Sequence, residues 1–191
     1  MRIHLLDNLV EIQPGYQTRG KILESLTGSH RLLQSKDITE EGINWETPLS
    51  FDPEIFPDRY RISHNDILFI ARGYENRAYL AVDPPANVLA SNTFYIIKPQ
   101  EIRPGYLAWW LNEKPAQAYF AQFQVKMGYA YMSKKNLVKL EVPVPALEIQ
   151  EKISKALKLW NHEKHLISNI QELKESVMSS IFLSASQKKD G

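Results

Sequence analysis

The sequence predicts an α+β protein, with a mixed α/β domain over residues 1–142 followed by one long C-terminal coiled-coil helix over 149–183. Two observations lead to this fold class. After Pro145 there is no further proline, the only glycine is the last residue, and apolar residues recur at alternating steps of four and three, as on one face of a helix. Before Pro143, short β-rich runs alternate with Gly and Pro turn signals, which is typical of strands joined by loops.

Five segments of the domain have strand character because they are apolar or half-alternating and end at turn signals. The clearest is 66–71, where an apolar run follows Asp66 and ends at an Arg-Gly turn. The other four segments are 5–12, 31–36, 79–82 and 93–97. Between 104 and 124 the apolar spacing becomes helical, and Pro115 predicts either one interrupted helix or two helices, 104–113 and 115–124, that meet there.

The boundary between the domain and the C-terminal helix is marked by two prolines. Val142-Pro143-Val144-Pro145 cannot be interior helix, because each proline lacks an amide donor and holds its predecessor in an extended conformation. Residues 143–148 are therefore predicted to be a proline-containing extended link. The helix follows over 149–183, and 184–191 is predicted to be a flexible tail.

The predicted helix carries an apolar stripe that continues for more than four heptads. Of its ten core-type positions, Glu163 and Lys174 are charged, and Leu157, Leu166 and Leu173 widen the stripe on one flank. A helix of this length, roughly 50 Å at 1.5 Å per residue, cannot bury such a stripe on itself. It is predicted to pack against a partner helix or a second subunit, although a helix that lies on its own domain is the alternative. The apolar core-type positions are Ile149, Ile153, Ala156, Trp160, Ile167, Ile170, Val177 and Ile181.

The composition narrows the class of protein. The absence of cysteine excludes disulfides, thiolate metal sites and cysteine nucleophiles. The N-terminus lacks the apolar stretch of a signal peptide, and no run approaches the roughly 18 apolar residues of a membrane span. A cytoplasmic protein is expected.

Charge is segregated along the chain although the net charge is only +1. Segment 13–36 has four basic residues against one acid, and 126–140 has four basic residues and no acid, whereas 37–58 has seven acids and no Lys or Arg. Segregated charge lets a nearly neutral protein present one basic face to nucleic acid. The alternative is that these runs are ordinary solvated surface.

Motifs for catalysis or cofactor binding are not found. The sequence contains no glycine-rich nucleotide loop, nucleophile elbow or HExxH motif, so no catalytic residue, cofactor or metal is predicted. His162 and His165 have a spacing that can bind metal, but surface histidines are the more common interpretation. Asp66 with Glu75 lacks the companion Glu-x-Lys of a nuclease, and Asp83-Pro84-Pro85-Ala86 lacks the aromatic residue of an adenine methyltransferase motif.

Three loops combine turn residues with side chains suited to DNA: 13–21, 71–77 and 126–135. Glutamine suits adenine edges, arginine suits guanine, and lysine suits phosphate. Each loop alone could be an ordinary polar turn, but the three together favour a DNA-binding surface. The predicted DNA-binding residues are Tyr16, Gln17, Arg19, Lys21, Lys36, Arg72, Tyr74, Arg77, Lys126, Tyr129, Tyr131, Lys134 and Lys135.

The order of motifs resembles the target-recognition domain and following helix of type I restriction–modification specificity subunits. The residues that carry the resemblance are 33–38 (Leu-Gln-Ser-Lys-Asp-Ile), 65–73 (Asn-Asp-Ile-Leu-Phe-Ile-Ala-Arg-Gly), 90–94 (Ala-Ser-Asn-Thr-Phe), 106–111 (Tyr-Leu-Ala-Trp-Trp-Leu), Gly128, and 140–150, which contains the two prolines before the helix. The family usually reads Gly-Asp-Ile-Leu where this chain has Asn65-Asp66-Ile67-Leu68.

The resemblance implies a non-catalytic protein that chooses a sequence in double-stranded DNA while partner subunits act on it. Those partners are an adenine-DNA methyltransferase (M) subunit and a restriction (R) subunit. Family members normally hold two recognition domains and two long helices, whereas one of each is present here. A half-length form that pairs with a copy of itself, or with another half, and reads one half of a bipartite site is therefore expected. The alternatives are a truncated remnant without an active partner, an adaptor that uses its coiled coil without binding DNA, and a fragment of a DNA-modifying enzyme.

Overall fold

The structure is a computed structural model of the 191-residue chain, and it describes residues 2–18, 20, 22, 24–39, 42–54, 58–73, 75–123 and 130–187. The chain divides into two compact units, Met1–Ser154 and Lys155–Gly191. Among the described residues, the strands and the short helices belong to the first unit, and the second unit is the greater part of one helix.

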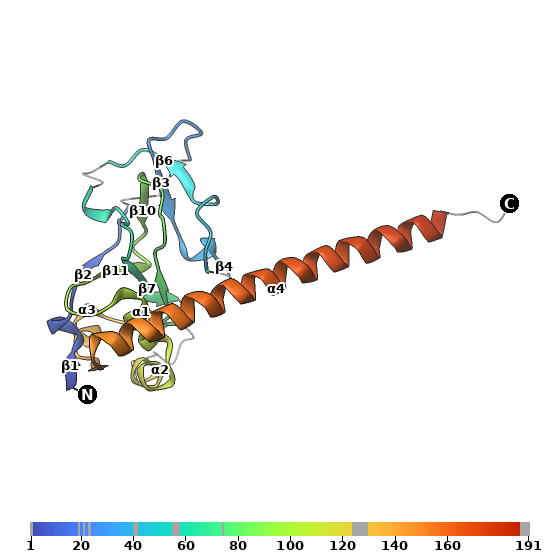
Figure 1. Ribbon diagram of the computed structural model, residues 1–191. Helices are drawn as coiled ribbons and strands as arrows, with labels where there is room; N and C mark the ends of the chain where they lie inside the picture. The colour runs from blue at the N-terminus through green and yellow to red at the C-terminus, as the bar shows by residue number, and fades with distance from the viewer. Residues whose placement is uncertain are drawn as a thin grey trace. The chain divides into compact units, whose positions relative to one another are not determined.

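An antiparallel sheet lies at the centre of the first unit (Figure 1). Its strands, in spatial order, are β2 (Val10–Pro14), β11 (Phe94–Pro99), β7 (Ile67–Ile70) and β9 (Ala78–Leu80). β7 is buried on both faces, which agrees with its continuous run of apolar residues. In the register of β7 with β11, Ile70 lies opposite Phe94 and Ile67 opposite Ile97.

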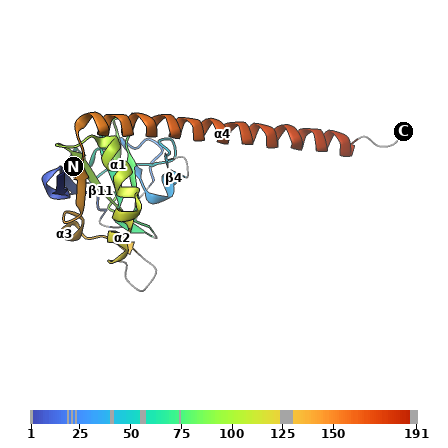
Figure 2. The ribbon, with the colours of Figure 1, turned by 60° about the horizontal axis from the view of Figure 1, so that its bottom comes forward.

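Alternate residues of β7 belong to two separate hydrophobic cores, because successive side chains of a strand point to opposite faces. Ile67 and Phe69 pack in the core that also includes α1 (Pro104–Asn112) and α2 (Lys114–Ala121), and α1 is seen beside the sheet in Figure 2. Leu68 and Ile70 pack in the second core. The Asn112 side chain accepts a hydrogen bond from the Ala78 amide and donates one to the Ala78 carbonyl, which fixes α1 to β9.

A second, three-stranded sheet contributes to the other core. Its order is β10 (Val88–Ala90), β3 (His30–Leu33) and β6 (Leu49–Phe51), with β10 and β3 parallel. Three two-stranded pairs complete the strands: β1 (Arg2–Leu5) with β13 (Glu141–Val144), β4 (Ile38–Thr39) with β5 (Gly42–Ile43), and β8 (Arg72–Gly73) with β12 (Ala130–Tyr131). The remaining short helices are η1 (Leu6–Asn8), η2 (Ser35–Asp37), η3 (Asp58–Tyr60) and α3 (Lys134–Leu137).

The long helix α4 spans Leu147–Gln187, and its first turns belong to the first unit. Gln150 is buried there: its side chain accepts a hydrogen bond from the Arg103 amide and donates one to the Pro145 carbonyl. Arg103 also pairs with Glu151 at 2.6 Å. These contacts fix the beginning of α4 against the beginning of α1.

The α+β fold class with a long C-terminal helix is confirmed, and the two helices predicted on either side of Pro115 are α1 and α2. The helix α4 begins two residues before the predicted start and ends four residues beyond the predicted end. No helix in the described part of the chain has the length and apolar character needed to cross a membrane.

Two predictions about strands were wrong. The predicted strand 5–12 is interrupted by η1, because Leu6 turns inward and its amide donates to the Leu140 carbonyl. The strand predicted over 31–36 ends at Leu33, since Gln34 and Asp37 form a capping box that starts η2. The extended link predicted over 143–148 overlaps strand β13, which pairs with β1 so that Pro143 lies opposite Ile3, and α4 begins within it at Leu147. Proline is tolerated in such a two-stranded ribbon because one edge of each strand needs no amide donor.

Candidate nucleic-acid interface

A cavity of about 220 Å³ opens where three parts of the first unit meet. The end of β2 and the residues after it supply one side, and η3 supplies another. The rest comes from the segment after β7 with β8, from the connection between β10 and β11, and from β11. Among the described residues that line it none is acidic, and two are arginines. The lining residues are Pro14, Gly15, Gln17, Arg59, Tyr60, Ala71, Arg72, Asn92 and Tyr95.

The loop after β2 is held against the segment that joins β10 and β11. The Gly15 amide donates to the Phe94 carbonyl at 3.0 Å, and the next amide, of Tyr16, donates to the Ala90 carbonyl. A Cβ atom on Gly15 would lie 2.0 Å from the Ser91 carbonyl oxygen, so only glycine permits this close approach. Close packing against Ser91 therefore requires glycine at position 15, and the same segment brings Gln17 to the cavity.

Arg72 reaches the cavity from β8. Its backbone amide and that of Ala71 both donate to the Thr93 carbonyl, and β8 pairs with β12 so that Arg72 lies opposite Tyr131. The Arg72 guanidinium lies over the Tyr131 ring, 5.4 Å from its centroid. Burial raises the pKa of the Tyr95 hydroxyl, and the neighbouring Tyr131 adds to the shift. Tyr131 is thus adjacent both to Arg72 and to a residue that lines the cavity.

The two arginines of the cavity differ from neighbouring cations in their charge partners. Arg61 pairs with Asp58 at 2.8 Å, and Arg77 pairs with Glu75 at 2.9 Å. No carboxylate of the described residues pairs with Arg59 or Arg72. Arg59 instead lies over the Tyr60 ring at 6.0 Å. Two cations without acidic partners beside amide and phenol side chains make this surface suited to an anionic, hydrogen-bonding ligand.

The structure brings several of the predicted DNA-binding residues together here. Gln17 and Arg72 line the cavity, and the Arg72 guanidinium lies over the Tyr131 ring. The Lys134 ammonium donates to the Ile12 carbonyl at 2.6 Å, which connects α3 to β2, and Lys135 is the next, exposed residue of α3. Lys36 in η2 and Arg77 are exposed but do not line the cavity.

Tyr16 is the one predicted DNA-binding residue that the structure contradicts. Its side chain is 3% exposed and packs against Phe51 and Tyr60, and its hydroxyl accepts a hydrogen bond from the Glu54 amide. A ring buried in this way cannot reach a base or a phosphate. Arg19, Lys21, Tyr74, Lys126 and Tyr129 lie outside the described residues.

Four lining residues were missed by the sequence analysis: Arg59, Tyr60, Asn92 and Tyr95. Arg59 and Tyr60 could have been predicted from the sequence, because in Arg59-Tyr60-Arg61 an aromatic residue stands between two cations directly after the acidic segment 37–58. Asn92 lies in one of the segments that carry the family resemblance. Tyr95 belongs to a β-rich run and has no local feature that separates it from a core residue.

The carboxylates considered for an enzyme site lie in three separate arrangements. Buried Asp66 pairs with Lys98 at 3.1 Å and accepts a hydrogen bond from the Ser63 amide. Glu75 pairs with Arg77, and Asp83 lies 3.3 Å from the His64 ring nitrogen. The described residues contain no group of three His, Asp or Glu side chains that could hold a metal ion. Each of these carboxylates already has a structural partner.

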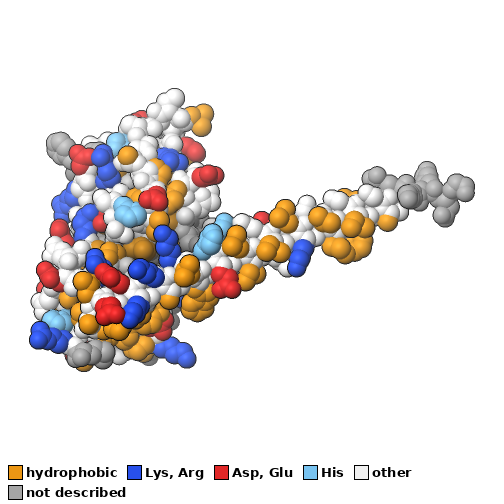
Figure 3. All heavy atoms as spheres, in the orientation of Figure 1, with side chains coloured by type: hydrophobic (Ala, Val, Ile, Leu, Met, Phe, Trp, Pro, Cys, Tyr) orange, Lys and Arg blue, Asp and Glu red, His pale blue; other side chains and the backbone are white. Residues whose placement is uncertain are grey.

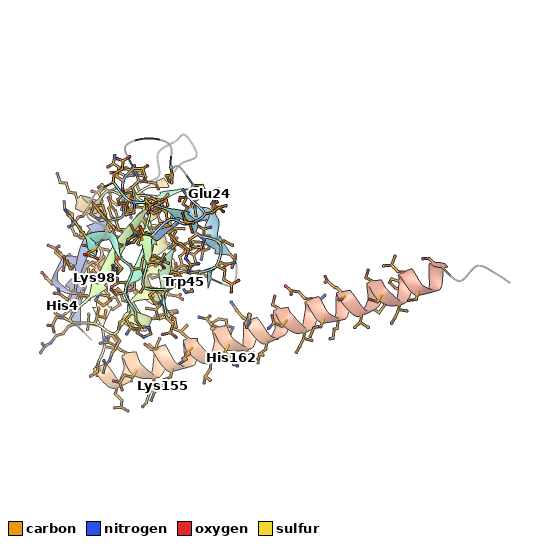
Figure 4. All side chains as sticks on the ribbon, turned by 90° about the horizontal axis from the view of Figure 1, so that it is seen from above. His4, Glu24, Trp45, Lys98, Lys155 and His162 are labelled. Atoms are coloured by element: carbon orange, nitrogen blue, oxygen red, sulfur yellow. The ribbon has the colours of Figure 1, made fainter. Side chains whose placement is uncertain are left out.

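The second unit presents apolar side chains along α4 (Figure 3). Side chains also stand out from the helix in Figure 4, where Lys155 and His162 are labelled. Trp160 is exposed, with the Lys164 ammonium over its ring at 4.9 Å. The predicted partner-helix positions Ala156, Ile167, Ile170, Val177 and Ile181 are exposed, as is Ile149 in the first unit. Ile153 differs, because it is partly buried against the first unit's own core.

Comparisons with known proteins match this chain to one family model and to several solved structures. A family model described as the type I restriction modification DNA specificity domain matches residues 47–177. The S subunit of a type I restriction-modification system from M. genitalium aligns with a TM-score of 0.63 at 14% identity, over 94% of this chain and 44% of that chain. The HsdS subunit from Thermoanaerobacter tengcongensis aligns with a TM-score of 0.62 at 17% identity, over 89% of this chain and 39% of that one.

A chain from a structure of complex assembly and conformational transition in the type I R-M system aligns with a TM-score of 0.63 at 16% identity, over 94% of this chain and 43% of that chain. The present chain thus spans less than half the length of each of these solved chains. At such identities the likeness concerns the fold. No curated protein matches the sequence.

Proposed function

The chain belongs to the family of type I restriction modification DNA specificity domains, and from this premise we propose that it binds double-stranded DNA in a sequence-dependent way. In this proposal the first unit reads one half of a bipartite site through the cavity surface, defined by Gln17, Arg59, Arg72, Asn92 and Tyr131. The chain itself is non-catalytic and requires no cofactor. It directs an adenine-DNA methyltransferase subunit, and a restriction subunit where one is present, to the site.

The observation that carries the proposal is the meeting of segments from distant parts of the sequence around two arginines that have no acidic partner among the described residues. Phosphate contacts supply most of the affinity of a protein for DNA, and arginine serves both phosphate and guanine. Amide side chains at the same surface, from Gln17 and Asn92, can donate to and accept from base edges. The formal net charge of +1 is compatible with this, because the charge at the cavity is local.

The exposed apolar face of α4 supports the second part of the proposal, which concerns assembly. A helix with Trp160, Ile167 and Ile170 exposed gains free energy by burying them against another helix. We propose that α4 pairs with α4 of a second copy, or with the corresponding helix of another recognition half, and that the paired helices also offer a docking surface to the methyltransferase subunit. An adaptor without DNA binding would use α4 in the same way, so DNA binding is the property to test.

The test is a salt titration with the purified chain and a fluorescently labelled duplex, followed by fluorescence anisotropy. The logarithm of the binding constant is expected to fall linearly with the logarithm of the salt concentration. Arg59→Ala is expected to weaken binding and to reduce the slope by about one, whereas Arg2→Ala on β1 leaves both unchanged. Absence of binding at low salt, or equal effects of the two substitutions, would reject the proposed surface.

A further inference from the structure

We infer that Arg72 reads a guanine base, and that the Tyr131 ring holds its guanidinium in the orientation that this contact needs. The inference rests on the proposed function, and it adds the identity of a specificity-determining residue and of the residue that positions it. In this assignment Arg59, the other arginine of the cavity, contacts the DNA backbone.

The backbone of Arg72 is fixed from two directions. The Thr93 carbonyl accepts hydrogen bonds from both the Ala71 and the Arg72 amides, at 2.8 and 3.2 Å. On the other side, the Met132 amide donates to the Ala71 carbonyl at 2.9 Å, next to the pairing of Arg72 with Tyr131. Arg72 therefore projects from a paired strand and not from a free loop, and paired strands hold a functional side chain more accurately than loops do.

The side chain of Arg72 is restricted as well. Its guanidinium lies over the ring of Tyr131, which is the cation–π arrangement that arginine adopts on aromatic faces. In this inference the ring covers the flat face of the guanidinium and leaves its edge of N–H donors available. A guanine presents two acceptors, O6 and N7, in the major groove, and this fork of donors matches them with two parallel hydrogen bonds.

Tyr131 is itself held in place. Strand β12 pairs with β8 at Tyr131 and Arg72, and Tyr131 is next to Tyr95, which lines the cavity. The Tyr131 side chain nevertheless remains 45% exposed, so the stacked pair faces solvent where DNA can approach. Restricting a long side chain before binding reduces the conformational entropy that the contact would otherwise cost.

The other cations near the cavity lack this combination. Arg59 is in η3 and lies further from its aromatic neighbour, 6.0 Å over Tyr60. Lys134 is bonded to the Ile12 carbonyl, and Arg77 is paired with Glu75. Among these four described cations, only Arg72 combines a strand-paired backbone, a guanidinium 5.4 Å from an aromatic ring centroid, and a side chain without an acidic or carbonyl partner.

The test selects bound sequences from a duplex library with a randomised segment, using the whole chain and its variants. The wild-type chain is expected to enrich a motif in which one position favours guanine by about 10- to 100-fold. Arg72→Lys keeps the positive charge but lacks the fork, so this preference is expected to fall to within about threefold at that position only. Arg59→Ala is expected to weaken binding of all sequences while the motif stays the same.

Tyr131 is tested by three substitutions with different ring character. Tyr131→Phe keeps the aromatic face and is expected to retain the guanine preference. Tyr131→Leu and Tyr131→Ala remove that face and are expected to lose preference at the same position as Arg72→Lys does, with the rest of the motif retained. Circular dichroism melting of each variant checks that the fold is intact.

Each outcome has one meaning. A wild-type chain that binds DNA without enriching any motif would refute the proposed function and the inference together. Because a lysine ammonium can also donate to guanine O6 and N7, Arg72→Ala decides this point: a motif that survives it at every position would refute the inference alone and would make Arg72 a phosphate contact. Equal motifs for Tyr131→Phe and Tyr131→Leu, both still with guanine, would overturn the positioning role of the ring.

Discussion

A double substitution on α4, Ile167→Asp with Ile170→Asp, tests whether this helix holds two recognition halves together. The two side chains are 60% and 51% exposed in the single chain. Full burial of an isoleucine is worth about 1.5–3 kcal/mol, so closing the remaining exposure against a partner contributes about 1 kcal/mol for each side chain. In a pair of identical helices the two substitutions remove this contribution from both, about 4 kcal/mol in all. Because 1.4 kcal/mol changes an equilibrium constant tenfold, the dimer should weaken by at least about 1000-fold.

The estimate is a lower bound, because an aspartate buried between helices also loses its hydration. The assay is light scattering over a range of protein concentrations, with circular dichroism to confirm that α4 is still helical. Asn161→Asp with Ser179→Asp is the matched control. At 100° per residue, both positions lie on the side of the helix opposite Ile167 and Ile170, and both are exposed. The control adds the same two charges and should leave the mass unchanged.

Two results would refute the reasoning. A wild-type chain that is monomeric at every concentration would show that α4 does not pair with its own copy, and the partner would have to be another half or the methyltransferase subunit. A double variant that remains dimeric would place the interface elsewhere on the chain.

Three further predictions concern the first unit. Phe69→Ala removes a fully buried ring that packs on Phe120 with 5.1 Å between the ring centroids. Urea unfolding should show that the free energy of unfolding falls by about 3–5 kcal/mol, whereas Leu26→Ala, at an exposed position, should change it little. Gly15→Ala places a Cβ atom 2.0 Å from the Ser91 carbonyl oxygen, so the free energy of unfolding should fall by about 1–3 kcal/mol. Fluorescence anisotropy should show a weaker affinity for DNA, and unchanged binding would mean that the segment around Gly15 is not part of the interface. Hydrogen bonds from Ser29 lower the pKa of Asp52 below its usual 3.8, so the carboxylate stabilises the fold above that pH and the contribution is lost as pH falls through the folded pKa. Asp52→Ala should accordingly lower the Tm at neutral pH, and the difference in Tm between the variant and the wild type should become smaller below about pH 3.8. A difference in Tm that does not depend on pH would contradict this assignment.

The parts of the fold that local sequence determines were predicted well. The two prolines at 143 and 145 mark the approach to α4, and the period of its apolar residues defines the helix. Pro115 separates α1 from α2 for a similarly local reason, because it fits the first turn of a helix. Strand β7 was predicted from its own residues, since a strand buried on both faces is apolar throughout.

The cavity could be predicted only in part, because it depends on contacts between distant residues. Composition identified Gln17, Arg72 and Tyr131 as suited to DNA, but nothing local indicates that Arg72 and Tyr131 are paired across two strands of two residues each. Tyr16 shows the opposite failure. It lies in a loop of suitable composition, yet its ring is buried against Phe51 and Tyr60, which only the tertiary structure reveals. Propensity describes a segment, whereas the direction of a loop side chain is set by the rest of the protein.

If paired α4 helices separate two recognition halves, their length should set the gap in the DNA site. Duplication of residues 167–173 adds seven residues, which lengthens a helix by about 10 Å and preserves the apolar face to within about 20°. Since successive base pairs are about 3.4 Å apart, the gap between half-sites should grow by about three base pairs. An insertion of two alanines after Leu173 is the control, because it rotates the following face by about 200° and should abolish pairing. Library selection with the longer chain measures the gap, and a gap that does not change would mean that the halves are held apart by something other than α4.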